Sequence, residues 1–338
     1  MIPRTLPAWQ GSSWQEELSA CVRDPDELIR LLQLEDSPLA LAEAAWRQFP
    51  VRVPRPYLQR MRPGDPHDPL LLQVLPVAEE DITVPGFIAD PLGELAANPI
   101  RGLIHKYHGR VLLMVSSACA IHCRYCFRRH FPYSDNTPSR SQWQEALDYL
   151  RTHTEITEVI FSGGDPLAAS DRHLSWLVDQ LAAIPHLRRL RVHSRLPVVI
   201  PARITDECVD WLTRTHLQPS LVLHVNHPNE IDREMIARLA TLRRRGVVLL
   251  NQTVLLRGVN DDSTTLEALS ERLFEAGVLP YYLHLLDRVA GAAHFEVSEH
   301  EAVRLVEQLM VRLPGYLVPK LVREVAGEAS KSPISLST

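Results

Sequence analysis

The sequence CAIHCRYCFRRHFPY, from Cys119 to Tyr133, contains three of the five cysteines in a chain of 338 residues. Their spacing is C-x3-C-x2-C, so three thiols can point toward one centre from a single loop. The other two cysteines, Cys21 and Cys208, lie far away in the sequence. Neighbours this close rarely bridge one another, so we interpret the group as thiols or metal ligands rather than as a disulfide framework.

Three kinds of site could use these thiols. A structural zinc ion takes four ligands, commonly as two separated pairs; the chain has no second cysteine pair, although His122 could supply a fourth ligand. An iron–sulfur cluster takes closely spaced thiolates, and three of them leave one metal position open for another molecule. This favours a reactive cluster, with structural zinc or three unligated buried thiols as the alternatives.

After residue 110 the chain alternates short apolar runs with amphipathic segments. Six strand candidates, each followed by a helix, predict a parallel α/β sheet with right-handed crossovers that opens flat or curls into a barrel or part of one. The strand candidates are 111–116, 158–164, 190–194, 221–226, 247–256 and 279–286, and the helix candidates are 141–153, 171–184, 205–215, 234–245, 264–277 and 299–313.

Polar side chains gather where these apolar runs end. The carboxyl ends of parallel strands meet at one rim, where α/β proteins bind their ligands, so we expect a single large active site there. Its candidates are the cysteines, Ser162 to Asp165, His193 to Arg195, His224 with Asn226, Asn251 with Gln252, and Asp287.

Composition excludes several other functions. The chain is 45% hydrophobic with a net charge of -5, and its basic clusters lie inside periodic segments, so we expect no nucleic-acid partner. The first thirty residues lack a signal-peptide pattern, and no run of about 18 apolar residues occurs, so we expect a cytoplasmic protein without membrane segments.

The cysteine loop resembles a known signature. C-x3-C-x-aromatic-C, with Tyr125 as the aromatic residue, is similar to the motif of the radical S-adenosylmethionine superfamily, which follows the first strand of a (β/α)6 partial barrel. The resemblance implies that Cys119, Cys123 and Cys126 hold three irons of a [4Fe-4S] cluster, while S-adenosylmethionine chelates the fourth.

Further residues match the superfamily's S-adenosylmethionine site. The sequence SGGD after the second strand resembles its glycine-rich element, where missing side chains let the backbone approach the methionine amino group. The implied contacts are Ser162, Gly163, Gly164, Asp165, His224 and Gln252.

From about residue 85 to the end, the chain resembles the lysine 2,3-aminomutase family. The segments HKYHGRVLL, CFRRHF, HSRLPVVIPARIT, NQTVLLRGVND and PYYLHLLD carry the likeness. That family also uses pyridoxal phosphate bound covalently to a lysine, and this chain has only three lysines. Lys331, in VAGEASKSP, matches the cofactor lysine, Arg110 matches the arginine at the cofactor phosphate, and Lys106 is a second candidate for that phosphate.

The resemblance also assigns substrate contacts. Arg128 matches an arginine that binds the substrate carboxylate, a task suited to a planar guanidinium. Asp287 and Glu324 match two acids that bind the ε-ammonium of lysine. The second acid is an aspartate in the lysine enzymes, so Glu324 shifts the pocket by one methylene group.

Within the family, the chain resembles the branch that makes (R)-β-lysine for modification of translation elongation factor P. Free-lysine catabolic members carry an extra cysteine near the VND motif and a cysteine cluster beyond the cofactor lysine; here the first place reads VNDDS, and seven residues follow Lys331. The implied partners are L-lysine, a reductant such as flavodoxin or ferredoxin, and a separate ligase.

The sequence therefore predicts a helical extension over 1–95, a radical S-adenosylmethionine partial barrel over 96–313 and a pyridoxal-phosphate segment over 314–338. The alternatives are an aminomutase for catabolic or stored β-amino acids, acting on free lysine or glutamate, and a non-catalytic iron–sulfur or zinc-binding protein.

Overall fold

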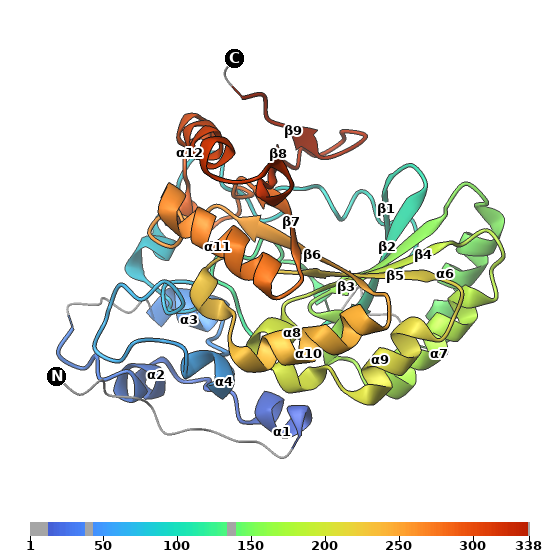
Figure 1. The fold of residues 1–338 in the computed structure, drawn as a ribbon, viewed down its shortest axis with the longest axis horizontal. Coiled ribbons are helices and arrows are strands. Elements are labelled where there is room, and N and C mark those ends of the chain that lie inside the picture. The colour runs from blue at the N-terminus through green and yellow to red at the C-terminus, as the bar shows by residue number, and fades with distance from the viewer. Residues whose placement is uncertain (1–12, 38–42, 134–139, 337–338) are drawn as a thin grey trace.

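The computed structural model describes residues 13–37, 43–133 and 140–336. Within them, nine strands form one sheet in chain order (Figure 1): β1 (Leu103–Tyr107), β2 (Arg110–Ser116), β3 (Glu158–Gly163), β4 (Arg189–Ser194), β5 (Gln218–Leu223), β6 (Val248–Val254), β7 (Leu279–His284), β8 (Lys320–Arg323) and β9 (Ser332–Pro333). Strands β2 to β8 run parallel, and β1 and β9 add an antiparallel strand at each edge. The predicted α/β fold with a largely parallel sheet is confirmed.

Strands β1, β8 and β9 were not predicted from the sequence. Lys106, expected ahead of the first strand, lies within β1, which turns into β2 at Gly109. Gly109 has φ of +75°, a conformation that glycine adopts without strain. Strands β8 and β9 have four and two residues, which is too short for an alternating pattern to be recognised.

Six helices follow the strands as expected, and most of them begin at a side-chain cap. Ser170, Thr205, Asp232, Asp262 and Ser298 each accept a hydrogen bond from a backbone N–H of the first turn. Among the described residues, none of the helices combines the length and apolarity needed to cross a bilayer. The helices are α6 (Arg140–Thr152), α7 (Asp171–Ala182), α9 (Asp206–Thr213), α10 (Arg233–Arg244), α11 (Ser263–Glu275) and α12 (Glu299–Arg312), with a short α8 (Leu196–Val199) after β4.

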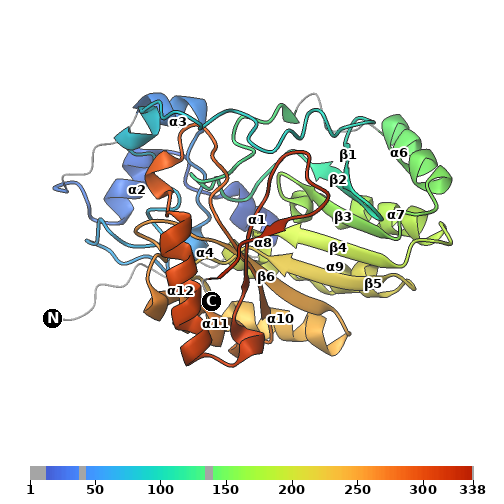
Figure 2. The ribbon, with the colours of Figure 1, turned by 90° about the horizontal axis from the view of Figure 1, so that it is seen from above.

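The N-terminal part forms shorter helices than its pattern suggests. The segment 13–35 divides into α1 (Trp14–Ser19) and α2 (Pro25–Leu31), because Val22 pairs with Val53 as an isolated bridge and Pro25 opens a new helix. Two further short helices follow, α3 (Glu43–Gln48) and α4 (Arg55–Leu58). In both views α2 and α3 lie toward the end of the molecule away from α6 and α7, whereas α1 lies nearer the middle (Figures 1 and 2). Their buried side chains share one hydrophobic core with the barrel.

Strand geometry decides which side chains face the concave side of the sheet. Side chains alternate along a strand, so one set turns inward and the next turns toward the helices. In β6, Leu250, Gln252 and Val254 line the inner cavity, whereas Asn251 and Thr253 are buried on the other side. The inward set of each strand thus helps to build one shared site.

Candidate active site

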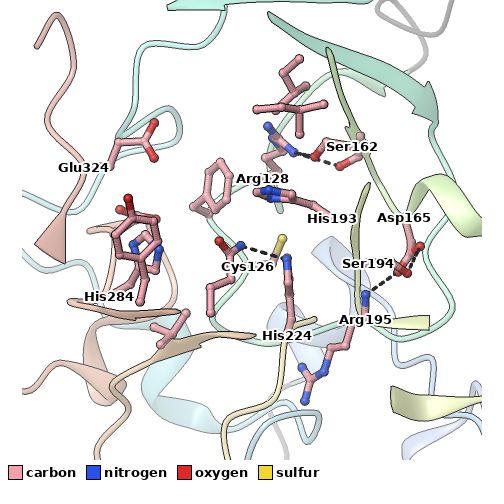
Figure 3. Close-up of a pocket in the computed structure, with 18 of the residues that line it drawn as sticks. Cys126, Arg128, Ser162, Asp165, His193, Ser194, Arg195, His224, His284 and Glu324 are labelled. Carbon is pink, nitrogen blue, oxygen red and sulfur yellow. Dashed lines mark hydrogen bonds between the residues drawn. The ribbon is translucent and has the colours of Figure 1, made fainter. Parts of the chain in front are cut away.

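One cavity of about 640 Å³ lies on the concave side of the sheet, a volume typical of ligand sites. All fifteen residues assigned to the site from the sequence line it: Cys119, Cys123, Cys126, Ser162, Gly163, Gly164, Asp165, His224, Gln252, Arg128, Asp287, Glu324, Lys331, Lys106 and Arg110. Figure 3 shows Glu324 and His284 on one side, Ser162, Asp165 and Ser194 on the other, and Cys126 and Arg128 between them.

The cysteine loop forms one wall of this cavity. Burial raises the pKa of the Cys119 thiol, and so does the charge of Cys126; burial and Cys123 raise the pKa of Cys126 to about 11. Bare thiolates are therefore disfavoured here, and a cation that offsets their charge would stabilise them. Within the described residues, no three His, Cys, Asp or Glu side chains gather closely enough to share one ion.

Arg195, which follows β4, forms hydrogen bonds to the cysteine loop. Its Nη1 donates to Cys123 Sγ at 2.7 Å and to the Tyr125 hydroxyl at 2.5 Å. Its Nη2 donates to Gln73 Oε1 at 2.7 Å and to Glu230 Oε2 at 3.0 Å. The aromatic residue of the signature is therefore part of a buried network that fixes Cys123.

The SGGD segment packs directly against the strand end that precedes the cysteines. A Cβ at Gly163 would lie 2.4 Å from the Ser116 carbonyl oxygen, and one at Gly164 would lie 2.6 Å from that of Ala118. Both glycines are therefore required by the close approach of two backbones.

Asp165, the last residue of SGGD, uses its carboxylate within the protein. Its oxygens accept hydrogen bonds from the Ser194 hydroxyl at 2.7 Å and from the backbone N–H groups of Leu167, Arg195 and Leu196 at 2.8 to 3.0 Å. Asp165 lies in the cavity wall, but these contacts favour a role in fixing the start of α8 over direct contact with a ligand.

Histidines on the cavity floor are neutral. Burial lowers the pKa of His224 to about 3, and its Nε2 lies 2.9 Å from Nε2 of Gln252. Burial also lowers the pKa of His193 and His284 well below the usual value, and the Nε2 atoms of both have no hydrogen-bond partner in the protein. Unsatisfied buried nitrogens that line a cavity indicate polar groups supplied by a ligand.

Five charged side chains of alternating sign cross the cavity. Nε and Nη2 of Arg128 donate to both oxygens of Glu94 at 2.6 and 2.8 Å, and Lys106 Nζ lies 3.5 Å from Glu94 Oε1. Lys106 Nζ also donates to Glu324 Oε1 at 3.1 Å, and Lys331 Nζ donates to Glu324 Oε2 at 2.8 Å. The sequence-assigned carboxylate ligand, phosphate ligand, ammonium ligand and cofactor lysine are thereby brought into one line.

The pKa values of Asp287 and Glu324 are shifted in opposite directions. Burial raises the pKa of Asp287 to about 7, and the charge of Glu324 adds to the rise while Lys331 opposes it. For Glu324, burial favours the neutral acid, but the ammonium groups of Lys331 and Lys106 outweigh it and lower the pKa to about 2. The pair thus has one permanently charged acid and one that titrates near neutrality.

Two cations of the cavity, Arg110 and Lys331, lie next to aromatic rings. The Arg110 guanidinium lies 4.6 Å from the centre of the Tyr107 ring, and Lys331 Nζ lies 5.8 Å from that of Tyr282. Arg110 has no acidic partner closer than 4.0 Å among the described residues, so its charge is available to an anion, whereas Lys106 is already paired with two acids.

Glu94, Gln73 and Glu230 were not assigned to the site from the sequence. Glu94 and Gln73 lie in the N-terminal extension, in turn-rich segments without a periodic pattern that could point to a cavity. Glu230 lies four residues beyond Asn226, the last residue of the fourth predicted strand run, and its Oε1 accepts a hydrogen bond from the Asn226 backbone N–H at 2.9 Å. Proximity to Asn226 was the one signal that could have identified it.

Comparison with known proteins agrees with this geometry. Residues 113–269 match the family model of the Radical SAM superfamily. The chain is 53% identical to the L-lysine 2,3-aminomutase of Escherichia coli (strain K12) over 98% of this chain and 97% of that protein. It is 48% identical to the enzyme of the same name from Haemophilus influenzae over 98% of each. A solved radical SAM methyltransferase from Sphaerobacter thermophilus has a TM-score of 0.45 and 19% identity over 65% of this chain and 68% of its own.

The matching family model and the two aminomutase relatives define a radical S-adenosylmethionine enzyme. Within that class, the chain belongs to the lysine 2,3-aminomutase family, and it is an isomerase. The cofactors of this family are a [4Fe-4S] cluster, S-adenosylmethionine and pyridoxal phosphate. The three thiols, the unpaired histidine nitrogens and the unpaired Arg110 fit a cluster and polar cofactors in this cavity.

Proposed function

We propose that the chain is a lysine 2,3-aminomutase that converts L-α-lysine to (R)-β-lysine. The observation that carries the proposal is the arrangement of charge in the cavity: Arg128 lies beside the cysteine loop, and Asp287 and Glu324 lie beside Lys331. An amino acid with a cationic side chain complements both ends. The anionic side chain of glutamate would be repelled by the two acids. Proteins that are 53% and 48% identical carry the name L-lysine 2,3-aminomutase.

The proposed roles follow the positions of the side chains. Cys119, Cys123 and Cys126 hold the cluster, His224 and Gln252 contact S-adenosylmethionine with the SGG backbone, and Lys331 and Arg110 hold pyridoxal phosphate. When bound, the reduced cluster and S-adenosylmethionine supply a radical that removes a hydrogen atom from the substrate, and pyridoxal phosphate supplies a π-system through which the amino group migrates.

The chain's own residues orient the substrate and exclude water. Arg128 and Glu324 carry fixed opposite charges, so they set the direction in which lysine lies. Apolar groups such as Ile160, Val254 and Leu286 line the space between. Dry walls protect a reactive radical from side reactions.

The domain division at residues 95 and 313 stays part of the proposal, as do a flavodoxin or ferredoxin reductant and the cytoplasmic location. The role in modifying elongation factor P rests on the resemblance to that branch, including Asp261-Asp262-Ser263 where catabolic members have a cysteine. A separate ligase would attach the (R)-β-lysine product.

Product analysis tests the proposal. The protein is reconstituted anaerobically with iron, sulfide and pyridoxal phosphate and incubated with L-lysine, S-adenosylmethionine and a chemical reductant; chiral chromatography should then detect (R)-β-lysine. A parallel incubation with L-glutamate should give no β-glutamate. Absence of β-lysine from a sample with a full complement of iron, sulfide and pyridoxal phosphate would refute the activity.

The elongation factor P role needs a second test. Product from the first incubation is supplied to an elongation factor P ligase together with the unmodified factor, and intact-mass measurement should show addition of one lysyl mass. The ligase should prefer this product to L-α-lysine. Failure of the ligase to use it would remove this role and leave the aminomutase activity in place.

A further inference from the structure

Arg128 is assigned to the substrate carboxylate, yet a carboxylate of the chain itself already occupies it. Nε and Nη2 of Arg128 hold the two oxygens of Glu94, the paired geometry in which a guanidinium recognises a carboxylate. Nη1 donates to the Ser162 hydroxyl at 2.9 Å and to the Gly163 carbonyl at 3.1 Å. Four of the five N–H groups of the guanidinium are therefore in use.

The pair is buried, so water does not loosen it. Arg128 is 8% exposed and Glu94 is 4% exposed. With one N–H left on Nη2, a substrate carboxylate cannot form two parallel hydrogen bonds to Arg128 while Glu94 stays in place. Substrate binding through Arg128 therefore requires Glu94 to leave this edge.

The opposite end of the cavity is occupied in a matching way. Lys331 offers an ammonium to Glu324 at 2.8 Å, the same group that the side chain of lysine would bring there. Lys331 gives up that ammonium when it holds the cofactor covalently. Glu94 undergoes no such reaction, so it can leave Arg128 only by exchange with another anion.

The backbone hydrogen bonds around Glu94 are mostly local. Residues 90–97 are outside helices and strands, and Leu95 is exposed. The Glu94 N–H donates to Asp90 Oδ1 at 3.1 Å, and the Ala97 N–H donates to the Glu94 carbonyl at 3.2 Å, so turns hold the backbone at Glu94 itself. The His105 N–H of β1 donates to the Ala97 carbonyl at 2.9 Å and fixes the end of the segment, and Leu92 is buried. Lys106, 3.5 Å from Glu94 Oε1, offers a second cation to a displaced carboxylate.

We propose that Glu94 is a further positioning residue of the substrate site: it holds Arg128 in the empty enzyme and is displaced by the α-carboxylate of the incoming amino acid. The inference rests on the proposed lysine substrate. Only a ligand that brings its own carboxylate opens the Arg128–Glu94 pair. A diamine of the same length leaves the pair closed, so Glu94 should lower the affinity for free lysine and leave the affinity for the diamine unchanged.

Binding of L-lysine and of 1,5-diaminopentane, which is lysine without its carboxylate, tests the proposal. Both ligands are titrated anaerobically into protein loaded with cluster and pyridoxal phosphate, and dissociation constants are taken from the visible absorbance. Glu94→Gln weakens the competitor for Arg128, so the lysine constant should fall about tenfold, within the range of one charge-assisted hydrogen bond. The diamine constant should stay within about twofold, because a diamine does not compete for Arg128. Weaker lysine binding in this variant would overturn the proposal, since Glu94 would then be a fixed support for Arg128.

Glu80→Gln is the matched control. Glu80 holds Arg124 through two hydrogen bonds at 2.8 and 2.6 Å and is buried, but neither residue lines the cavity. Its substitution should leave the ratio of lysine to diamine constants unchanged. An equal change of that ratio in Glu80→Gln would overturn the assignment to Glu94, because any buried pair would then have the same effect.

Hydrogen exchange of the unsubstituted protein keeps the proposal testable if Glu94→Gln does not fold. Saturating lysine should accelerate exchange of the Glu94 and Ala97 amides, because the segment is released, and the diamine should not. Slower or unchanged exchange with lysine would contradict displacement. If the protein turns over a different amino acid, the proposed function fails, and the same two experiments with that amino acid and its decarboxylated amine decide the role of Glu94.

Discussion

Two buried arginines on the cavity wall differ in what holds them. Arg195 is 5% exposed and contacts Cys123 of the cysteine loop, and Arg128 is 8% exposed and follows Cys126 by two residues. Each pairs with one glutamate. The partner of Arg195 is itself held by the fold, whereas the partner of Arg128 is carried by a turn segment at the surface.

Glu230 illustrates a fixed partner. Its Oε1 accepts hydrogen bonds from the backbone N–H groups of Asn226 and His227 at 2.9 and 3.0 Å and from the Gln73 side chain at 3.3 Å, and its Oε2 accepts from Arg195. Every direction around the carboxylate is occupied by structure. Such a network specifies a position and has no place for a ligand.

Glu94 has no comparable support. Both of its oxygens face cations of the cavity, Arg128 and Lys106. Comparison of the two pairs indicates that a buried ion pair positions a residue when backbone groups complete it. When only ligand-binding side chains complete it, the pair is available for exchange.

The largest effect on activity is expected at Lys331, the last of the five charged side chains that cross the cavity. Lys331→Ala should remove the visible absorbance of covalently bound pyridoxal phosphate and reduce β-lysine formation below detection, because the covalent attachment point is lost. The charge-transfer absorbance of the cluster should remain, since the polar partner of Lys331 is Glu324 and not a cysteine. Ultraviolet–visible spectra and product analysis measure both.

Lys320→Ala is the control for that prediction. Lys320 is an exposed residue of β8, so its substitution should leave the cofactor absorbance intact. If the absorbance is retained in Lys331→Ala and lost in Lys320→Ala, the cofactor is bound to Lys320 and the assignment to Lys331 is wrong.

Substitution in the Arg195–Glu230 pair should lower the free energy of unfolding. Glu230→Gln leaves the Arg195 guanidinium without its carboxylate and places an amide N–H₂ against backbone donors. Removal of one partner of a buried ion pair typically costs about 3–5 kcal/mol of the free energy of unfolding. Urea unfolding of cluster-loaded protein measures the loss, and the ratio of lysine to diamine affinity should not change. A stable Glu230→Gln protein with altered ligand preference would reverse the distinction between the two arginines.

The exchangeable side should also respond to pH. The pKa of Asp287 is raised to about 7, so the carboxylate that attracts the substrate ammonium forms only as pH rises through 7. The substrate ammonium, with a pKa of about 10, stays charged. We expect kcat/KM to rise about tenfold between pH 6 and 8. The charge of Lys331 lowers the Asp287 pKa. Loss of that charge on cofactor attachment would therefore shift the rise of kcat/KM to higher pH.

Asp287→Asn checks the assignment, since it should remove the acidic limb and lower kcat/KM at pH 8. The raised pKa has a consequence for stability of the opposite sign: the contribution of Asp287 is fully present below its ordinary pKa and is lost as pH rises through about 7. An acidic limb that survives in Asp287→Asn would mean that another group titrates.

The sequence predicted much of the fold because periodicity reports burial. Strands β2 to β7 and the long helices that follow them have alternating or helical apolar patterns, and their caps are visible as Ser, Thr or Asp. The strands β1, β8 and β9 were missed because they are short. The predicted helical extension gave no sign of the break between α1 and α2, because the pairing of Val22 with Val53 is a tertiary contact. Local pattern contains no information on such a contact.

The site was predictable where residues follow strands or match a motif. The cysteine loop, Arg128 and Asp287 belong to that group, and all of them line the cavity. Their charge state was not predictable, because the partners come from elsewhere: Glu94 from an irregular segment and Lys106 from an unpredicted strand. Whether Asp165 faces a ligand or the backbone likewise depends on α8, which the sequence alone does not place.

The smallest effect on stability is expected for an exposed ion pair. Arg47 and Glu43, one turn apart on α3, lie 2.5 Å from each other with side chains that are 73% and 70% exposed. The distance is as short as those of the buried pairs, but water screens the charges and both side chains lose conformational freedom. Arg47→Ala should therefore change the free energy of unfolding by less than about 0.5 kcal/mol in urea titrations. A loss as large as that of Glu230→Gln would show that distance, and not the surroundings of the carboxylate, determines what such a pair contributes.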